Sequence, residues 1–74
     1  MNKDYSIYKN NSYVGCIHAE NYNITELKED DVMDHCYVMN FTDINNNIIA
    51  GFASDSTPKI ENDDMPYIFK VYLD

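Results

Sequence analysis

Arginine and tryptophan are absent from this 74-residue chain, and glycine and proline occur only twice each. Five lysines therefore supply all the permanent positive charge against thirteen Asp and Glu residues, which gives a net charge of −8. So few cations cannot form the basic patch that holds phosphates, and we expect no direct binding to nucleic acid or to anionic membranes. The charge favours a basic protein surface as the partner.

Long hydrophobic runs are also missing. No stretch approaches the roughly 18 apolar residues that a membrane-spanning helix requires, and the N-terminal residues do not resemble a secretory signal. The plentiful Asn, Ile, Lys and Tyr residues, with no Arg, are typical of AT-rich bacterial and phage genomes. We therefore expect a cytoplasmic protein of a bacterial host cell. With only Gly15 and Gly51, a glycine-rich phosphate-binding loop is excluded.

The hydrophobic and aromatic content is nevertheless that of a folded chain. Hydrophobic residues make up 45% of the sequence, and seven tyrosines dominate the aromatic residues. A chain of this length buries about 60% of the surface that its unfolded form exposes, so its core is thin. The composition predicts a single acidic, β-rich domain over residues 1–74.

Alternation of apolar and polar residues predicts five strands, at residues 4–9, 13–19, 35–42, 48–54 and 67–73. Asn23 and Glu26 are spaced like a helix-capping pair, which predicts a short helix over 24–33, with an extended loop as the alternative. Residues 55–66 contain two prolines and predict a polar loop. The predicted fold is α+β, a small antiparallel sheet of about five strands with one short helix. A five-stranded small β-barrel is the alternative.

The segment 41–52 admits a metal site or a hairpin. Asp43, Asn45 and Asn47 match the first ligands of a calcium loop. That loop also needs glycine where Ile48 stands and glutamate where Ser54 stands, and its flanks should be helices. Asn tolerates the positive φ of tight turns. We therefore predict that Asp43 to Asn47 turn the chain between two strands and hold no metal.

Two cysteines and two histidines are candidate ligands or nucleophiles. Cys16 and His18 share a strand face, whereas His35 and Cys36 are adjacent and point to opposite faces. This spacing disfavours zinc, and no neighbouring pattern supplies an oxyanion hole for a thiol nucleophile. A Cys16–Cys36 disulfide requires that their strands pair, and a cytoplasmic thiol stays reduced. We therefore predict two packed free thiols, no metal, no cofactor and no enzymatic activity.

Clustered carboxylates are the remaining feature. The ordinary interpretation is a solvated surface that keeps a small protein soluble. The functional interpretation is that carboxylates about 5–7 Å apart imitate the phosphates of a nucleic acid and enter a basic channel. The predicted partner-binding residues are Glu26, Glu29, Asp30, Asp31 and Asp34, followed by Asp63 and Asp64.

In size and charge the chain resembles phage-encoded inhibitors of bacterial defence nucleases, the anti-CRISPR and anti-restriction proteins. This resemblance implies a non-enzymatic DNA mimic that blocks the nucleic-acid channel of such a nuclease. The first alternative is a generic β-rich protein-interaction module that uses a sheet edge or a Tyr-rich face. The second is a small metal-dependent or thiol enzyme. Nothing in the sequence indicates the oligomeric state.

Overall fold

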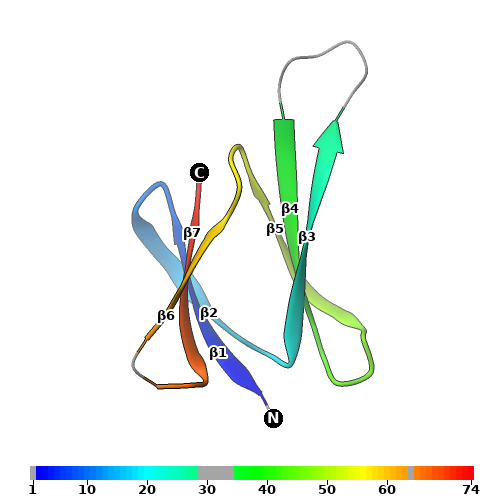
Figure 1. Cartoon of the computed structure of the whole chain (residues 1–74), viewed down its shortest axis with the longest axis vertical. Coiled ribbons are helices and arrows are strands. Elements are labelled where there is room, and N and C mark those ends of the chain that lie inside the picture. Colours follow the sequence, from blue (N-terminus) through cyan, green and yellow to red (C-terminus); the bar gives the residue numbers. More distant parts are fainter. Residues whose placement is uncertain (1, 29–34, 64) are drawn as a thin grey trace.

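A computed structural model describes residues 2–28, 35–63 and 65–74. Within these ranges the regular secondary structure consists entirely of β-strands (Figure 1). Two sheets form, one with the strand order β2–β1–β7–β6 and one with the order β3–β4–β5. Neighbouring strands run antiparallel except for β1 and β7, which run parallel. The strands are β1 Lys3–Lys9, β2 Ser12–Ala19, β3 Asn21–Lys28, β4 His35–Thr42, β5 Ile48–Ser54, β6 Lys59–Asn62 and β7 Ile68–Leu73.

The predicted α+β fold with one short helix is wrong. The first half of the predicted helix belongs to β3, which pairs antiparallel with β4 along its whole length, while residues 29–33 of that helix lie outside the described ranges. Pairing with β4 satisfies the backbone and turns Tyr22 toward the core, and this outweighs the weak capping pattern of Asn23 and Glu26. The alternative barrel is also wrong, because the two sheets remain separate.

The five predicted strands are confirmed, each with bounds within one residue of those expected. Two further strands were not predicted. β3 lies where the helix was expected, and β6 lies within the predicted polar loop 55–66. β6 is only four residues long, so it is too short for alternation to mark it.

The core lies between the two sheets and draws on strands from both. Tyr5 is at its centre, with ring centroids 4.9 Å from Phe41 of β4 and 5.2 Å from Phe69 of β7. Such ring pairs stabilise a core beyond the area that they bury. Buried apolar side chains alternate along β1, β4 and β7, and Ala19 at the end of β2 joins them. The buried core residues are Tyr5, Ile7, Ala19, Met39, Phe41, Val71 and Leu73.

Candidate functional site

In the sequence, the first predicted acidic cluster spans the end of β3 and the connection from β3 to β4. Glu26 lies on β3, and Lys28, the last residue of β3, pairs with His35, the first residue of β4. The chain between them carries the four other predicted contact residues, Glu29, Asp30, Asp31 and Asp34. These four, together with Asp64, lie outside the described ranges.

Asp63 is not brought together with Glu26. Asp63 follows β6, at the turn into β7, where its backbone N–H donates a hydrogen bond to the carbonyl of Ile68 (2.9 Å). Figure 1 places this turn at the opposite end of the long axis from the end where β3 leads into residues 29–34. Glu26 and Asp63, the described members of the two predicted acidic groups, therefore do not belong to one continuous patch.

Two other carboxylate residues, Asp55 and Asp74, lie at the end of the molecule where β3 ends and β4 begins. The backbone N–H of Asp55, just after β5, donates to the carbonyl of Asp74, just after β7 (3.1 Å), and the N–H of Asp74 donates to Ser54 Oγ (3.0 Å). Tyr37 of β4 pairs with Ser54 on one side and with Glu26 on the other. The sequence could not group Asp55 and Asp74 with Glu26, because they come from three separate segments.

Lys9, the last residue of β1, reaches this end of the molecule with its side chain. Its Nζ donates to the backbone carbonyls of Ala53 (2.7 Å) and Asp74 (2.5 Å). The ammonium therefore ties β1 to the ends of β5 and β7 by binding carbonyl oxygens. These bonds link the two sheets at this end, because β5 belongs to one sheet and β1 and β7 to the other.

Among the described Cys and His side chains, the candidates Cys16, His18 and Cys36 do not converge. Cys16 and His18 lie on β2 and Cys36 on β4, in different sheets, and both cysteines are free thiols. Among the described residues no group of three or more His, Cys, Asp or Glu side chains is placed to hold a metal ion. His18 instead meets Asp4 across the β1–β2 ladder, with Nδ1 2.5 Å from Oδ1. The sequence did not predict this pair, because only the register of β1 and β2 shows that Asp4 lies opposite His18.

The hairpin prediction for Asp43 to Asn47 is confirmed. β4 and β5 pair antiparallel on either side of it, and Asn46 has a positive φ of 64°. One carboxylate oxygen of Asp43 accepts hydrogen bonds from the backbone N–H groups of Asn45 and Asn47, each at 2.9 Å. These bonds lower the pKa of Asp43, with the Asn47 bond as the largest cause. The Asp43 carboxylate therefore stabilises the turn.

Comparison with protein-family models, curated proteins and solved structures gives no match. The described residues include no helix long and apolar enough to cross a membrane.

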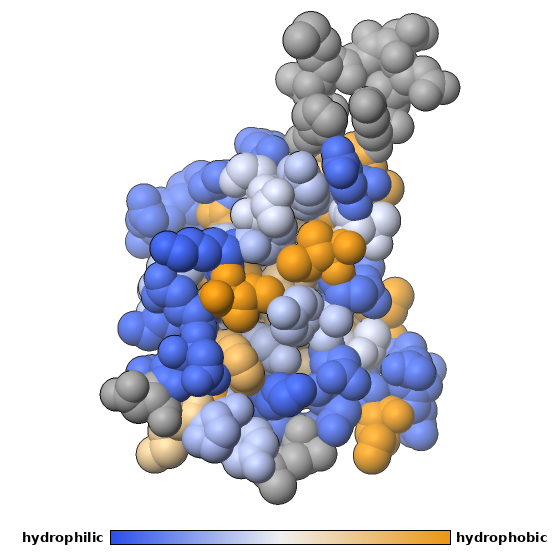
Figure 2. Space-filling model, viewed as in Figure 1, coloured by the Kyte–Doolittle hydropathy of each residue, from blue (hydrophilic) through white to orange (hydrophobic). Residues whose placement is uncertain are grey.

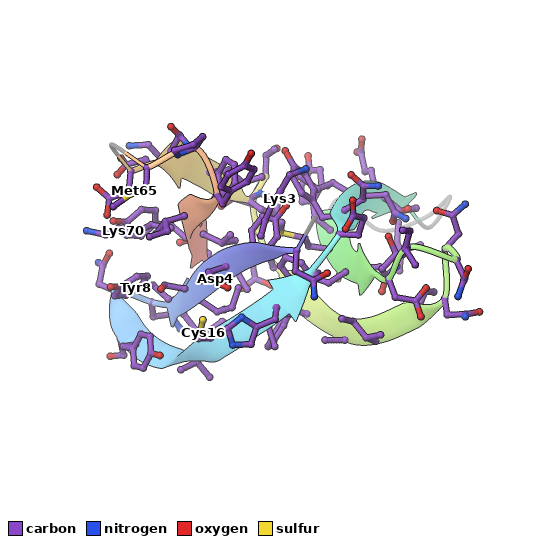
Figure 3. The ribbon with its side chains drawn as sticks, turned by 90° about the horizontal axis from the view of Figure 1, so that it is seen from below. Lys3, Asp4, Tyr8, Cys16, Met65 and Lys70 are labelled. Atoms are coloured by element: carbon purple, nitrogen blue, oxygen red, sulfur yellow. The ribbon has the colours of Figure 1, made fainter. Side chains whose placement is uncertain are left out.

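A row of tyrosines crosses the outer face of the four-stranded sheet. The rings of Tyr8 and Tyr72 are stacked with centroids 5.2 Å apart, and Tyr13 meets Tyr8 edge-on at 5.6 Å. The strand register puts Asp4, Ser6 and Tyr8 on this same face, beside Cys16 and Lys70. Figure 3, seen from below, labels four of these residues on this sheet. The row is a second candidate surface, which we call the tyrosine ladder (Tyr13, Tyr8 and Tyr72).

The surface seen in Figure 2 is mainly hydrophilic, with hydrophobic side chains in small separate groups. Binding through that face would therefore depend on polar and charged groups more than on one broad apolar patch. Exposed apolar side chains do occur along single strands, and β3 contributes Tyr22, Ile24 and Leu27.

Proposed function

We propose that this protein is a non-enzymatic inhibitor that acts in the bacterial cytoplasm by occupying the basic nucleic-acid channel of a defence nuclease. Its acidic end would take the place of the nucleic-acid backbone, as in a phage-derived anti-CRISPR or anti-restriction DNA mimic. The contact residues would be Glu26, Glu29, Asp30, Asp31 and Asp34, with Asp55 and Asp74 beside them. Asp63 and Asp64 are left out of this contact, because Asp63 belongs to the opposite end.

The pairing of Lys28 with His35 is the observation that carries this proposal. Because these residues are neighbours, the chain of 29–34 must leave and return at one place. Its four carboxylates, with no lysine among the six residues, would therefore meet a partner at that one place. The overall excess is thirteen acidic residues minus five lysines, or eight, so this segment supplies charge equal to half of it.

Charge of this kind would act on both the rate and the strength of binding. A net charge of −8 attracts a cationic channel over about a Debye length, roughly 8–10 Å at physiological salt. Pairing of the carboxylates with Lys and Arg would then hold the complex. Added salt should weaken it steeply.

The test is affinity capture from the lysate of a low-GC bacterium at low salt, followed by a salt gradient. We expect a nucleic-acid enzyme to be retained and then to elute as salt rises. The double variant Asp30→Lys with Asp31→Lys should abolish its retention, because it reverses charge inside the proposed contact.

The matched control is Asp63→Lys with Asp64→Lys, which changes the net charge by the same amount. It should retain the partner, since Asp63 lies at the opposite end of the long axis. Equal loss in both double variants would mean that only total charge matters, and retention by both would refute the proposed contact.

The tyrosine ladder supports a second candidate, a protein-interaction module that docks through a Tyr-rich face. Tyr13 is 60% exposed, and tyrosine combines a large rigid ring with a hydroxyl, which makes it a frequent anchor of interfaces. In that case Tyr13→Ala would remove binding of the captured partner, and retention would vary little with salt. Under mimicry the same variant would leave the partner bound.

A further inference from the structure

The outer face of the three-stranded sheet carries no charged residue at the positions fixed by the strand register. Met39 and Phe41 are buried in the core, so the alternate residues of β4 and their neighbours on β3 and β5 face outward. None of these outward positions is charged, although 24% of the residues in the chain are. They form three cross-strand rows, which are Leu27 and Cys36, then Thr25, Val38 and Ala53, then Asn23, Asn40 and Gly51.

The outer face of the four-stranded sheet shows the ordinary arrangement for comparison. It carries Asp4 beside His18, Lys59 beside Glu61, and Lys70. No described strand lies over the outer side of either sheet (Figure 1). Depletion of charged residues is the compositional sign of the centre of a protein interface, and it distinguishes the three-stranded sheet from the four-stranded one.

The uncharged face is also flat enough for another sheet to approach. A Cβ added at Gly51 would lie 2.7 Å from Asn40 Oδ1, so the Asn40 amide lies over the bare backbone of Gly51. Thr25 and Ala53, in the next row, are small and exposed. Leu27 is 52% exposed and adds apolar area at one end of the face. Small side chains of this kind suit the packing of two sheets about 10 Å apart.

Charge decides what kind of surface fits. A basic partner is attracted to carboxylates, and this face offers none. A second copy of the chain brings an equally uncharged face, and two-fold symmetry sets that face against itself. The net charge of −8 of each copy then lies entirely outside the contact. Asn23 and Asn40 suit such symmetry, because an amide carries both a donor and an acceptor and can bond to its own counterpart.

We propose that two copies of this chain associate through the outer face of the β3–β4–β5 sheet, sheet against sheet. Three strands make a face about 14 Å wide. Such a contact buries less than the about 1,200 Å² of stable complexes, so the dimer is weak, with a Kd of the order of 100 µM. This inference goes beyond the proposed inhibitor function and does not rest on the acidic contact.

The first test is sedimentation equilibrium of the native protein at low and high salt. We expect mainly monomer at about 10 µM and mainly dimer at about 1 mM. Raising the salt from about 50 mM to about 500 mM should tighten the dimer several-fold, because salt screens the repulsion between two chains of charge −8. A monomer at about 1 mM in both salts, or a dimer that weakens with salt, overturns the proposal.

The same change of salt separates this inference from the inhibitor function. Binding of a nuclease through carboxylates should weaken as salt rises, which is the opposite trend. Failure of one proposal therefore leaves the outcome of the other readable.

The two native thiols report which face is in contact. Cys36 lies on the uncharged face and Cys16 on the outer face of the other sheet, and both are free. Between about 10 µM and about 1 mM protein, the rate constant for maleimide labelling should fall about fourfold at Cys36, as the dimer fraction rises. It should not change at Cys16. Slowing at Cys16 instead of Cys36 overturns the proposal.

A matched pair of variants tests the face directly. Thr25→Lys places a charge at an exposed position of the edge strand β3, and Cys16→Lys does so on the edge strand β2 of the other sheet. Each lowers the net negative charge by one, so repulsion between copies falls equally. Thr25→Lys should remain monomeric at about 1 mM, because it buries an unpaired charge, while Cys16→Lys should dimerise like the native protein. Equal dimerisation of the two variants overturns the proposal. If Thr25→Lys does not fold, as judged by circular dichroism, the labelling rates of the native protein decide.

Discussion

Replacing Phe41 by leucine is the sharpest test of the packing between the two sheets. Phe41 is fully buried, with its ring centroid 4.9 Å from that of Tyr5 and 6.0 Å from that of Phe52. Each such ring pair contributes about 0.5–1.5 kcal/mol, so losing both costs about 1–3 kcal/mol. A domain of this size has a free energy of unfolding of only about 4–11 kcal/mol.

A loss of about 2 kcal/mol should be easy to measure. It should lower the urea midpoint by about 2 M, if the slope is near 1 kcal/mol per molar, and the melting temperature by about 8–16 °C. Urea unfolding followed by circular dichroism gives the first quantity directly. The native protein and the variant should show the same slope, since only stability changes.

Tyr13→Leu is the control for this prediction. Tyr13 also belongs to a ring pair, with Tyr8 at 5.6 Å, but it is 60% exposed and lies on the outer face. Its replacement should cost at most about 0.5 kcal/mol. Equal losses for the two variants, or less than about 0.5 kcal/mol for Phe41→Leu, would refute the view that the aromatic contacts between the sheets stabilise the fold.

Two further predictions concern the β4–β5 turn. The bonds from Asn47 and Asn45 lower the pKa of Asp43 below its model-compound value of 3.8, so its contribution to stability is present above about pH 4 and is lost as pH falls through the lowered pKa. Asp43→Ala should therefore lower the urea midpoint at pH 7, and the difference from the native protein should shrink as pH falls through the lowered pKa; a difference that does not change with pH would contradict this assignment. Asn46 has a φ of 64°, so Asn46→Ala should cost about 1 kcal/mol of unfolding free energy, while Asn46→Gly should be nearly neutral. Equal urea midpoints for these two variants would show that backbone strain at this residue is negligible.

Two of the strands that the sequence predicted correctly, β1 and β7, have a buried face of their own. Tyr5 and Ile7 alternate on β1, and Val71 and Leu73 on β7, and all four are buried. Alternation records burial of one face, so it predicted these strands well. The turn at Asp43 was also predictable, because the side chains of its own residues form its hydrogen bonds.

The segments that the sequence did not predict are those whose structure depends on distant partners. β3 has every described side chain exposed, and it is a strand because β4 pairs with it. β6 is a strand because it pairs with β7, with only Ile60 packed against the core. Neither local propensity nor periodicity contains such information.

The candidate surfaces depend on the same kind of information. The sequence located the acidic residues but grouped Glu26 with Asp63, which the fold separates along the long axis. The tyrosine ladder joins Tyr72 to Tyr8 and Tyr13 only because β1 lies beside β7. The register between strands that are distant in the sequence therefore decides which candidate residues share a surface.

The parallel pairing of β1 with β7 has a consequence for synthesis of the protein. β7 is the last strand along the described chain, yet it lies inside its sheet, between β1 and β6. Until β7 leaves the ribosome, β1 has a bare edge and Tyr5 and Ile7 lack their neighbours Phe69 and Val71. The nascent chain therefore has an incomplete sheet with an unpaired strand edge until Leu73 has left the ribosome. Chaperones that bind exposed strands would have their best opportunity in that interval.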